Sequence, residues 1–128
     1  MKRVEGSTLP KPAGHYSPAI IHNGLVYVSG QLPKVATEQG EMIPPTIEEQ
    51  TLQTLRNVEQ ILQAAGSDRT QVVRVTLYVS DIHLWAQVNQ TYAEFFGDHR
   101  PARSIVPVGK FRNGAMIEID VIAAVRQA

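Results

Sequence analysis

The chain has 128 residues, close to the commonest size of one domain, and 43% of them are hydrophobic, which is enough to build a core. Its 12 Lys and Arg residues balance 12 Asp and Glu residues, so it lacks the basic excess typical of nucleic-acid binders. Without cysteine, thiol nucleophiles, disulfides and thiolate metal sites are excluded. We expect one domain over residues 1–128 of a soluble, cytoplasmic protein, with no signal peptide or membrane span.

Residues 6–18, rich in proline and glycine, indicate an irregular lead-in. The apolar runs 19–22 and 25–30 flank Asn23-Gly24, a pair typical of a tight hairpin turn. Residues 31–45 are expected to form a loop. From Ile47 the apolar residues follow helical spacing, and this helix has Thr46 and Glu49 as a capping box and Gly66 as its stop.

Residues 72–79 alternate in the manner of a half-buried strand, with one face made by Val73, Val75, Leu77 and Val79. Asp81 can cap a second helix that ends at Gly97. Its apolar side chains are expected in the core: Leu84, Trp85, Val88, Tyr92, Phe95 and Phe96. Strands are predicted at 104–108, where Pro107 requires an edge or a bulge, and at 115–125.

This order, β-β-α-β-α-β-β, predicts an α/β two-layer sandwich in which a mixed sheet packs on two helices. The helices are expected to cover the side of the last strand that carries Ala115, Ile117, Ile119, Val121, Ala123 and Val125. Glu118 and Asp120 point to the other face, together with apolar neighbours. That face is too apolar to be left in water, so we expect a partner to cover it.

Arg103 and one of the two carboxylates of the last strand, Glu118 or Asp120, are the candidates for chemistry, each with an ordinary alternative. Arg103 is either a surface charge in a loop or a cation that the nearby Pro101 helps to hold stiffly, ready to grip a carboxylate with two hydrogen bonds. The two carboxylates are either solvated, or one of them lies at a subunit interface, where it positions a water or pairs with a cation. The four histidines show no ligand spacing, so no metal site is expected.

Several segments, in order, resemble the RidA/YjgF/UK114 family of enamine/imine deaminases, also known by the older name of L-PSP endoribonucleases. They are GHYSPAI (14–20), VYVSGQLP (26–33), IEEQTLQTLRNVEQIL (47–62), VVRVTLYVSDI (72–82), VNQTYAEFF (88–96), RPARS (100–104) and IEIDVIA (117–123). The resemblance implies a chorismate-mutase-like (YjgF-like) fold. It also implies a homotrimer with a central barrel-like core and with sites between subunits.

By this resemblance the family's carboxylate-binding arginine is Arg103 and its water-positioning glutamate is Glu118. The implied substrate-binding residues are Tyr16, Ser29, Gly30, Asn89 and Ile105. The implied reaction is hydrolysis of 2-aminoacrylate-type or 2-aminocrotonate-type intermediates to 2-keto acids and ammonia, without a cofactor. The expected partners are a small carboxylate-bearing substrate and other copies of the chain, but no membrane.

The sequence departs from the family pattern at the position of Ile105, where many relatives have cysteine or threonine. Ile105 cannot hydrogen-bond a substrate, and His15 replaces the proline that often precedes the tyrosine. Two other functions stay open. One, which Ile105 slightly favours, is a module that binds keto acids or amino acids without turnover. The other, which follows from the family's older name, is an endoribonuclease or translation inhibitor, against which the balanced charge argues.

Overall fold

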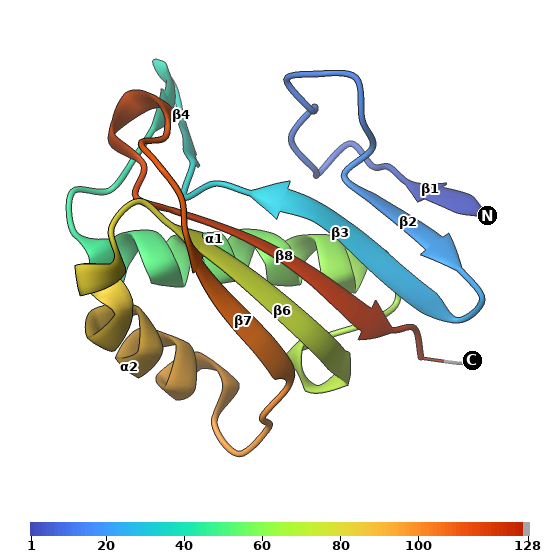
Figure 1. Ribbon diagram of the computed structural model, residues 1–128. Helices are drawn as coiled ribbons and strands as arrows, with labels where there is room; N and C mark the ends of the chain where they lie inside the picture. Colours follow the sequence, from blue (N-terminus) through green and yellow to red (C-terminus); the bar gives the residue numbers. More distant parts are fainter. Residues whose placement is uncertain (127–128) are drawn as a thin grey trace.

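The computed structural model describes residues 1–126, which form a six-stranded sheet with two helices on one side of it (Figure 1). Strands β6 and β7 are parallel and the other neighbouring pairs are antiparallel. The predicted α/β architecture with a mixed sheet is therefore confirmed. In spatial order the strands are β1 (Lys2–Val4), β2 (Ala19–His22), β3 (Leu25–Gln31), β8 (Ile117–Ala124), β6 (Val72–Val79) and β7 (Ala102–Pro107).

Helix α1 (Ile47–Ala64) begins and ends where its sequence signals predict. The Thr46 hydroxyl accepts the backbone N–H of Glu49 at 3.1 Å, and it donates its own proton to the Glu49 carboxylate at 2.8 Å. The carboxylate thus takes the hydroxyl proton rather than the backbone N–H of Thr46. Gly66 follows the helix with φ of 81°, a conformation that glycine adopts without strain.

Helix α2 (Trp85–Phe96) follows a 3₁₀ turn at Ile82–Leu84, which Asp81 caps by accepting the backbone N–H of His83 at 2.8 Å. The turn separates Asp81 from the helix it was expected to cap. Four of the predicted core residues are buried: Val88, Tyr92, Phe95 and Phe96. The prediction was wrong for Trp85, which is 44% exposed because it stands at the first residue of the helix.

Three short strands were not predicted, because three residues are too few to show alternation. Strand β1 extends the sheet beyond β2. Strands β4 (Val35–Thr37) and β5 (Gly40–Met42) form a separate hairpin within the segment expected to be a loop. The Asn23-Gly24 turn between β2 and β3 is as predicted, with φ of 52° and 78°.

Strand β6 contains an irregularity that the alternating sequence conceals. Val72 pairs with Ala123 and Arg74 pairs with Ile122, so one residue on β6 has no counterpart on β8. That residue is Val73, and it is 50% exposed, whereas Val72 is buried. The prediction that Val73 shares the buried face was therefore wrong, because the bulge shifts the alternation by one residue.

Strand β8 alternates as predicted, with every odd-numbered residue from Ile117 to Ala123 buried against the helices. The open face of the sheet is the opposite face, which no helix of residues 1–126 covers. It combines polar groups with partly or fully exposed apolar side chains, among them Ile20, Tyr27, Ile122 and Val106.

Gln50 fixes the approach to β8 from inside the core. Its side-chain amide donates to the carbonyls of Pro44 and Gly114 at 2.9 and 3.1 Å, and its carbonyl oxygen accepts the Met116 N–H at 2.7 Å. These bonds attach the loop before β8 to α1. They thereby fix the position of the first residues of β8, which include Glu118. No helix within residues 1–126 is long and apolar enough to cross a membrane.

Candidate functional site

Arg103 lies in strand β7, whose first residue is Ala102, and not in a loop before the strand as predicted. Pairing with β6 begins at Arg74↔Ala102, which draws Arg103 into the ladder opposite Val75. Val75 is buried under the helices, so Arg103 points to the helix-covered face. β7 is the outermost strand, which confirms that the strand with Pro107 lies at an edge.

The Arg103 guanidinium packs on aromatic rings of α2. Its carbon Cζ lies 4.8 Å from the centre of the Tyr92 ring and 5.8 Å from that of Trp85, both within the range of cation–π attraction. Within residues 1–126 no carboxylate lies at ion-pair distance from Arg103. Its charge is therefore supported by rings while its N–H donors remain unused by any acid of the described chain.

Ile105 and Asn89 accompany Arg103. Ile105 is two residues further along β7 and pairs with Leu77, so it faces the same side and packs against the core. Asn89 is one turn after Trp85 on α2 and is half-buried. We name these residues, with Trp85 and Tyr92, the arginine half-site.

Glu118 lies on the open face and directly over Gly30 of β3. A β-carbon at residue 30 would meet the Glu118 carboxylate, with its Cδ at 3.0 Å and its Cγ at 3.3 Å. Gly30 is therefore required by close approach and not by a turn. The two residues come from neighbouring strands, because β3 pairs with β8 through a register shift between Val28 and Gln31.

The surroundings of Glu118 raise its pKa above the ordinary carboxyl value. Partial burial is the larger cause, because it disfavours the charged form, and the negative charge of Asp120 adds to it. Asp120 itself accepts the Tyr78 hydroxyl at 3.0 Å, and this bond raises the pKa of Tyr78. Glu118 is thus a carboxyl group that can exchange a proton closer to neutral pH than an exposed glutamate.

Ser29 ties the lead-in segment to the end of β3. Its hydroxyl donates to the Ser17 carbonyl at 2.7 Å, and its backbone N–H donates to the Pro18 carbonyl at 2.9 Å. Tyr16 stands just before this tie and is 51% exposed. The Ser29 hydroxyl proton is already used, so this group can only accept a hydrogen bond from a substrate. We name Tyr16, Ser29, Gly30 and Glu118 the glutamate half-site.

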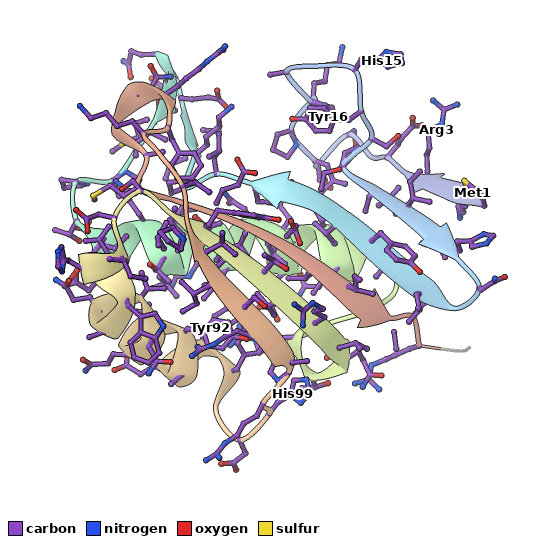
Figure 2. The ribbon with its side chains drawn as sticks, in the orientation of Figure 1. Met1, Arg3, His15, Tyr16, Tyr92 and His99 are labelled. Carbon is purple, nitrogen blue, oxygen red and sulfur yellow. The ribbon has the colours of Figure 1, made fainter. Side chains whose placement is uncertain are left out.

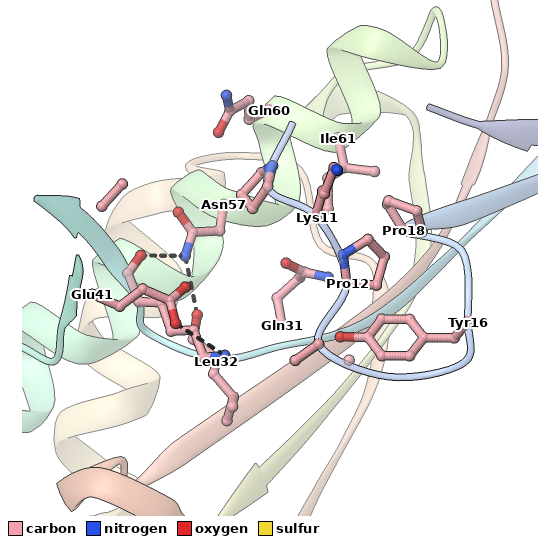
Figure 3. A pocket seen from close by; sticks show the side chains of 15 residues that line it. Lys11, Pro12, Tyr16, Pro18, Gln31, Leu32, Glu41, Asn57, Gln60 and Ile61 are labelled. Atoms are coloured by element: carbon pink, nitrogen blue, oxygen red, sulfur yellow. Dashed lines mark hydrogen bonds and ion pairs between the residues drawn. The ribbon is translucent and has the colours of Figure 1, made fainter. Parts of the chain in front are cut away.

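A pocket adjoins the glutamate half-site between the lead-in, the end of β3 and α1 (Figure 3). Tyr16 and Gly30 line it together with Gln31, while Asn57 of α1 forms part of its far wall. The Asn57 amide donates to the carbonyls of Leu32 and Lys34 at 3.0 Å each, which holds the segment after β3 in place. The pocket is therefore a preformed hollow beside Gly30.

The structure gathers the predicted residues into two groups and keeps the groups apart. Arg103 pairs with Val75 on the helix-covered face, whereas Glu118 pairs with Tyr78 on the open face. In Figure 2, Tyr16 on the lead-in and Tyr92 on α2 lie well apart. The two half-sites cannot meet around one small molecule within a single chain.

The sequence did not predict that Tyr92 and Trp85 lie near the site. Both were assigned to the core, yet both contact Arg103. Their separation by seven residues, two helical turns, places them along one face of α2 and was the signal that could have found them. Within residues 1–126 no three His, Asp or Glu side chains gather as potential metal ligands.

Comparison with known proteins gives consistent relatives. A family model described as Endoribonuclease L-PSP matches residues 6–125. A "RutC family protein" from Pyrococcus horikoshii is 40% identical over 114 residues, which are 89% of this chain and 90% of the relative. A rat protein named 2-iminobutanoate/2-iminopropanoate deaminase is 36% identical over 122 residues, which are 95% of this chain and 88% of the relative.

Solved structures agree over almost the whole chain. The E. coli YjgF gene product superposes with a TM-score of 0.87 at 32% identity and covers 98% of this chain and 100% of its own. E. coli TdcF, solved with bound serine, superposes with a TM-score of 0.87 at 29% identity and the same coverage. The fold described above is therefore the fold of these proteins.

Proposed function

The chain belongs to the Endoribonuclease L-PSP family, the RidA/YjgF family, and on this premise we propose that it hydrolyses reactive enamines and imines of the 2-aminoacrylate and 2-aminocrotonate type. The products are 2-keto acids and ammonia. Support comes from the rat relative, whose name describes deamination of 2-iminobutanoate and 2-iminopropanoate.

The reaction requires a protein only to bind the substrate carboxylate, to position a water and to transfer protons. An enamine takes up a proton on carbon to become an imine, water adds across the C=N bond, and ammonia leaves as the carbonyl forms. Arg103 holds the substrate carboxylate with two charge-assisted hydrogen bonds. Glu118 accepts a proton from the attacking water and returns one to the departing nitrogen, a role suited to a carboxyl whose pKa is raised. No oxidant or cofactor takes part.

We also propose that the active form is a homotrimer in which each site joins the arginine half-site of one copy to the glutamate half-site of the next. Two observations support the assembly. The half-sites lie on opposite faces of one sheet, so one chain cannot bring them together. The open face carries exposed apolar side chains that a neighbouring copy can cover.

One observation carries the proposed function: Arg103 has no acidic partner within residues 1–126, although its guanidinium is held in place. The test generates 2-aminocrotonate from threonine with a dehydratase and follows release of the keto acid. The wild type is expected to accelerate release, and Arg103→Ala is expected to lose the acceleration. Arg100→Ala, which removes an exposed arginine three residues before Arg103, is the matched control and keeps it. Equal rates with wild type and Arg103→Ala would refute the proposal.

The second candidate is a module that binds keto acids or amino acids without turnover. TdcF was solved with bound serine, and Ile105 gives this chain a less polar site than many relatives. Calorimetry with 2-ketobutyrate beside the hydrolysis assay separates the two. Binding that requires Arg103 but comes with no acceleration of hydrolysis favours the module.

A further inference from the structure

Arg69 and Arg103 both pack against aromatic rings, but the hydrogen-bond partners of their guanidinium N–H groups differ. The Arg69 guanidinium lies 3.8 Å from the centre of the Phe95 ring, and its N–H groups donate to both Glu59 carboxylate oxygens and to the Phe95 carbonyl. Arg103 has the rings without the acid. An aromatic face supports a cation without occupying its N–H edge, which leaves that edge open to an anion.

We propose that Tyr92 is a positioning residue whose ring fixes the Arg103 guanidinium for a carboxylate ligand, an inference that rests on the proposed function. Tyr92 is only 6% exposed, so the ring is rigidly packed and offers a fixed surface. An unsupported arginine side chain must lose its rotamer freedom when it binds, whereas a guanidinium already fixed has lost it beforehand. Trp85, at 5.8 Å, supports the guanidinium less closely.

Removing the Tyr92 hydroxyl while keeping the ring distinguishes the role of the ring from that of the polar group. This oxygen is buried and is the one buried side-chain polar atom of residues 1–126 without a hydrogen-bond partner. Burial raises the pKa of Tyr92 to about 12, so the hydroxyl stays neutral at physiological pH. Phenylalanine at this position keeps the ring and removes a polar atom that gains nothing in the described chain.

The test compares Tyr92→Phe, Tyr92→Leu and the control Phe96→Leu. Phe96 is a buried ring of the same helix that packs at a tilt of 49° against Tyr92 with centroids 4.7 Å apart, and it makes no cation–π contact with Arg103 within the described chain. Calorimetry measures the Kd for 2-ketobutyrate, and NMR relaxation of the Arg103 Nε–H without ligand measures how ordered the side chain is. Thermal unfolding reports the stability of each variant.

Tyr92→Leu is expected to raise the Kd roughly fivefold, the cost of immobilising one mobile side chain on binding, and to lower the order of the Arg103 side chain without ligand. In turnover its KM rises more than its kcat falls. Tyr92→Phe binds within about twofold of wild type and is at least as stable. Phe96→Leu loses stability as Tyr92→Leu does but keeps the wild-type Kd.

The inference is overturned if Tyr92→Leu leaves either the Kd or the Arg103 order unchanged, or if Phe96→Leu weakens binding equally. Should Tyr92→Leu fail to fold, the wild type decides. Arg103 Nε–H must then be more ordered than that of the exposed Arg100, and equal mobility overturns the inference. Because the NMR measurement needs no substrate, failure of the deaminase proposal shows separately as a wild type with an ordered Arg103 and no turnover.

Discussion

The carboxylate of Glu118 occupies the space that a β-carbon on Gly30 would need. Glycine at 30 and glutamate at 118 are therefore one structural unit, although 88 positions separate them in the chain. The consequences of changing either residue depend on the other.

Gly30→Ala is expected to lower turnover at least about tenfold while costing less than about 1 kcal/mol of unfolding free energy, because the flexible end of Glu118 can move aside but leaves its working position. In the Glu118→Gln background the same change adds little further loss, since the two effects act through one group. Steady-state rates of the double-mutant cycle measure this. Gly109→Ala, where a β-carbon meets nothing within 4 Å, is the control, and an equal loss there would contradict the explanation.

Glu118→Gln is expected to lower turnover by a factor of about 10² to 10⁴ without destabilising the fold. The raised pKa means that the folded state holds the charged form at a cost, so the wild type loses stability as pH rises through that pKa. The glutamine variant avoids this loss and is the more stable at neutral pH, by no more than about 1 kcal/mol for a partly exposed group. In denaturant titrations, the difference in unfolding free energy between the variant and the wild type should shrink towards zero below about pH 4, the range of ordinary carboxyl groups. A wild type that is more stable than the variant at pH 7 would contradict the assigned environment.

Asp120→Asn is expected to move the acidic limb of the pH–rate profile to lower pH. Partial burial still raises the pKa of Glu118 in this variant, but the second cause, the charge of Asp120, is gone. Glu118 then becomes charged, and able to act as a base, at lower pH. Asparagine keeps an oxygen for the Tyr78 hydroxyl, so the local packing is retained. An acidic limb that stays in place or moves to higher pH would show that Glu118 does not set it.

Arg103→Ala and Glu118→Gln are each expected to have little activity alone but to recover activity when unfolded together and refolded as a mixture. In a ring of copies a site works when its arginine half comes from the Glu118 variant and its glutamate half from the Arg103 variant. Random mixing gives about one quarter of wild-type activity. Refolding Arg103→Ala with the double variant is the control and yields none. No recovery in the first mixture would contradict a site shared between copies.

Arg69→Ala is expected to cost about 1–2 kcal/mol of unfolding free energy, because Arg69 joins Glu59 of α1 to the Phe95 carbonyl of α2. Arg69→Lys recovers only part of this, since lysine cannot make the two-pronged contact. The hydrogen bond from Arg69 lowers the pKa of Glu59, so the stabilisation is present above the ordinary carboxyl range and is lost as pH falls. In urea titrations, the difference in unfolding free energy between wild type and Arg69→Ala should therefore become smaller at acidic pH.

The sequence predicts the long elements well, because their patterns are local. Helix α1 carries its own cap and stop, and β8 shows on which face Glu118 lies. The family resemblance was confirmed as well. Two errors arose where pairing overrides pattern: the bulge that exposes Val73, and the ladder that takes Arg103 into β7. Neither can be deduced from alternation within one segment.

The grouping of the site residues was predictable only in part. Two carboxylates at i and i+2 on β8 show that Glu118 has an acidic neighbour. That Arg103 would face the helices depends on its register against β6, which no single segment encodes. The same register explains why Tyr92, expected only in the core, contacts the arginine.

Among the strands that the structure describes, β7 has a neighbour on one side only. The backbone groups on its outer side have no ladder partner in the described chain, so its hydrogen bonds can open locally while the rest of the sheet stays closed. We therefore expect β7, which carries Arg103, to open more readily than β8, which carries Glu118 and is paired on both sides. Amide exchange should accordingly be faster around Arg103 than around Glu118. A ligand that engages both residues slows exchange mainly in β7, which makes this strand the sensitive reporter of occupancy.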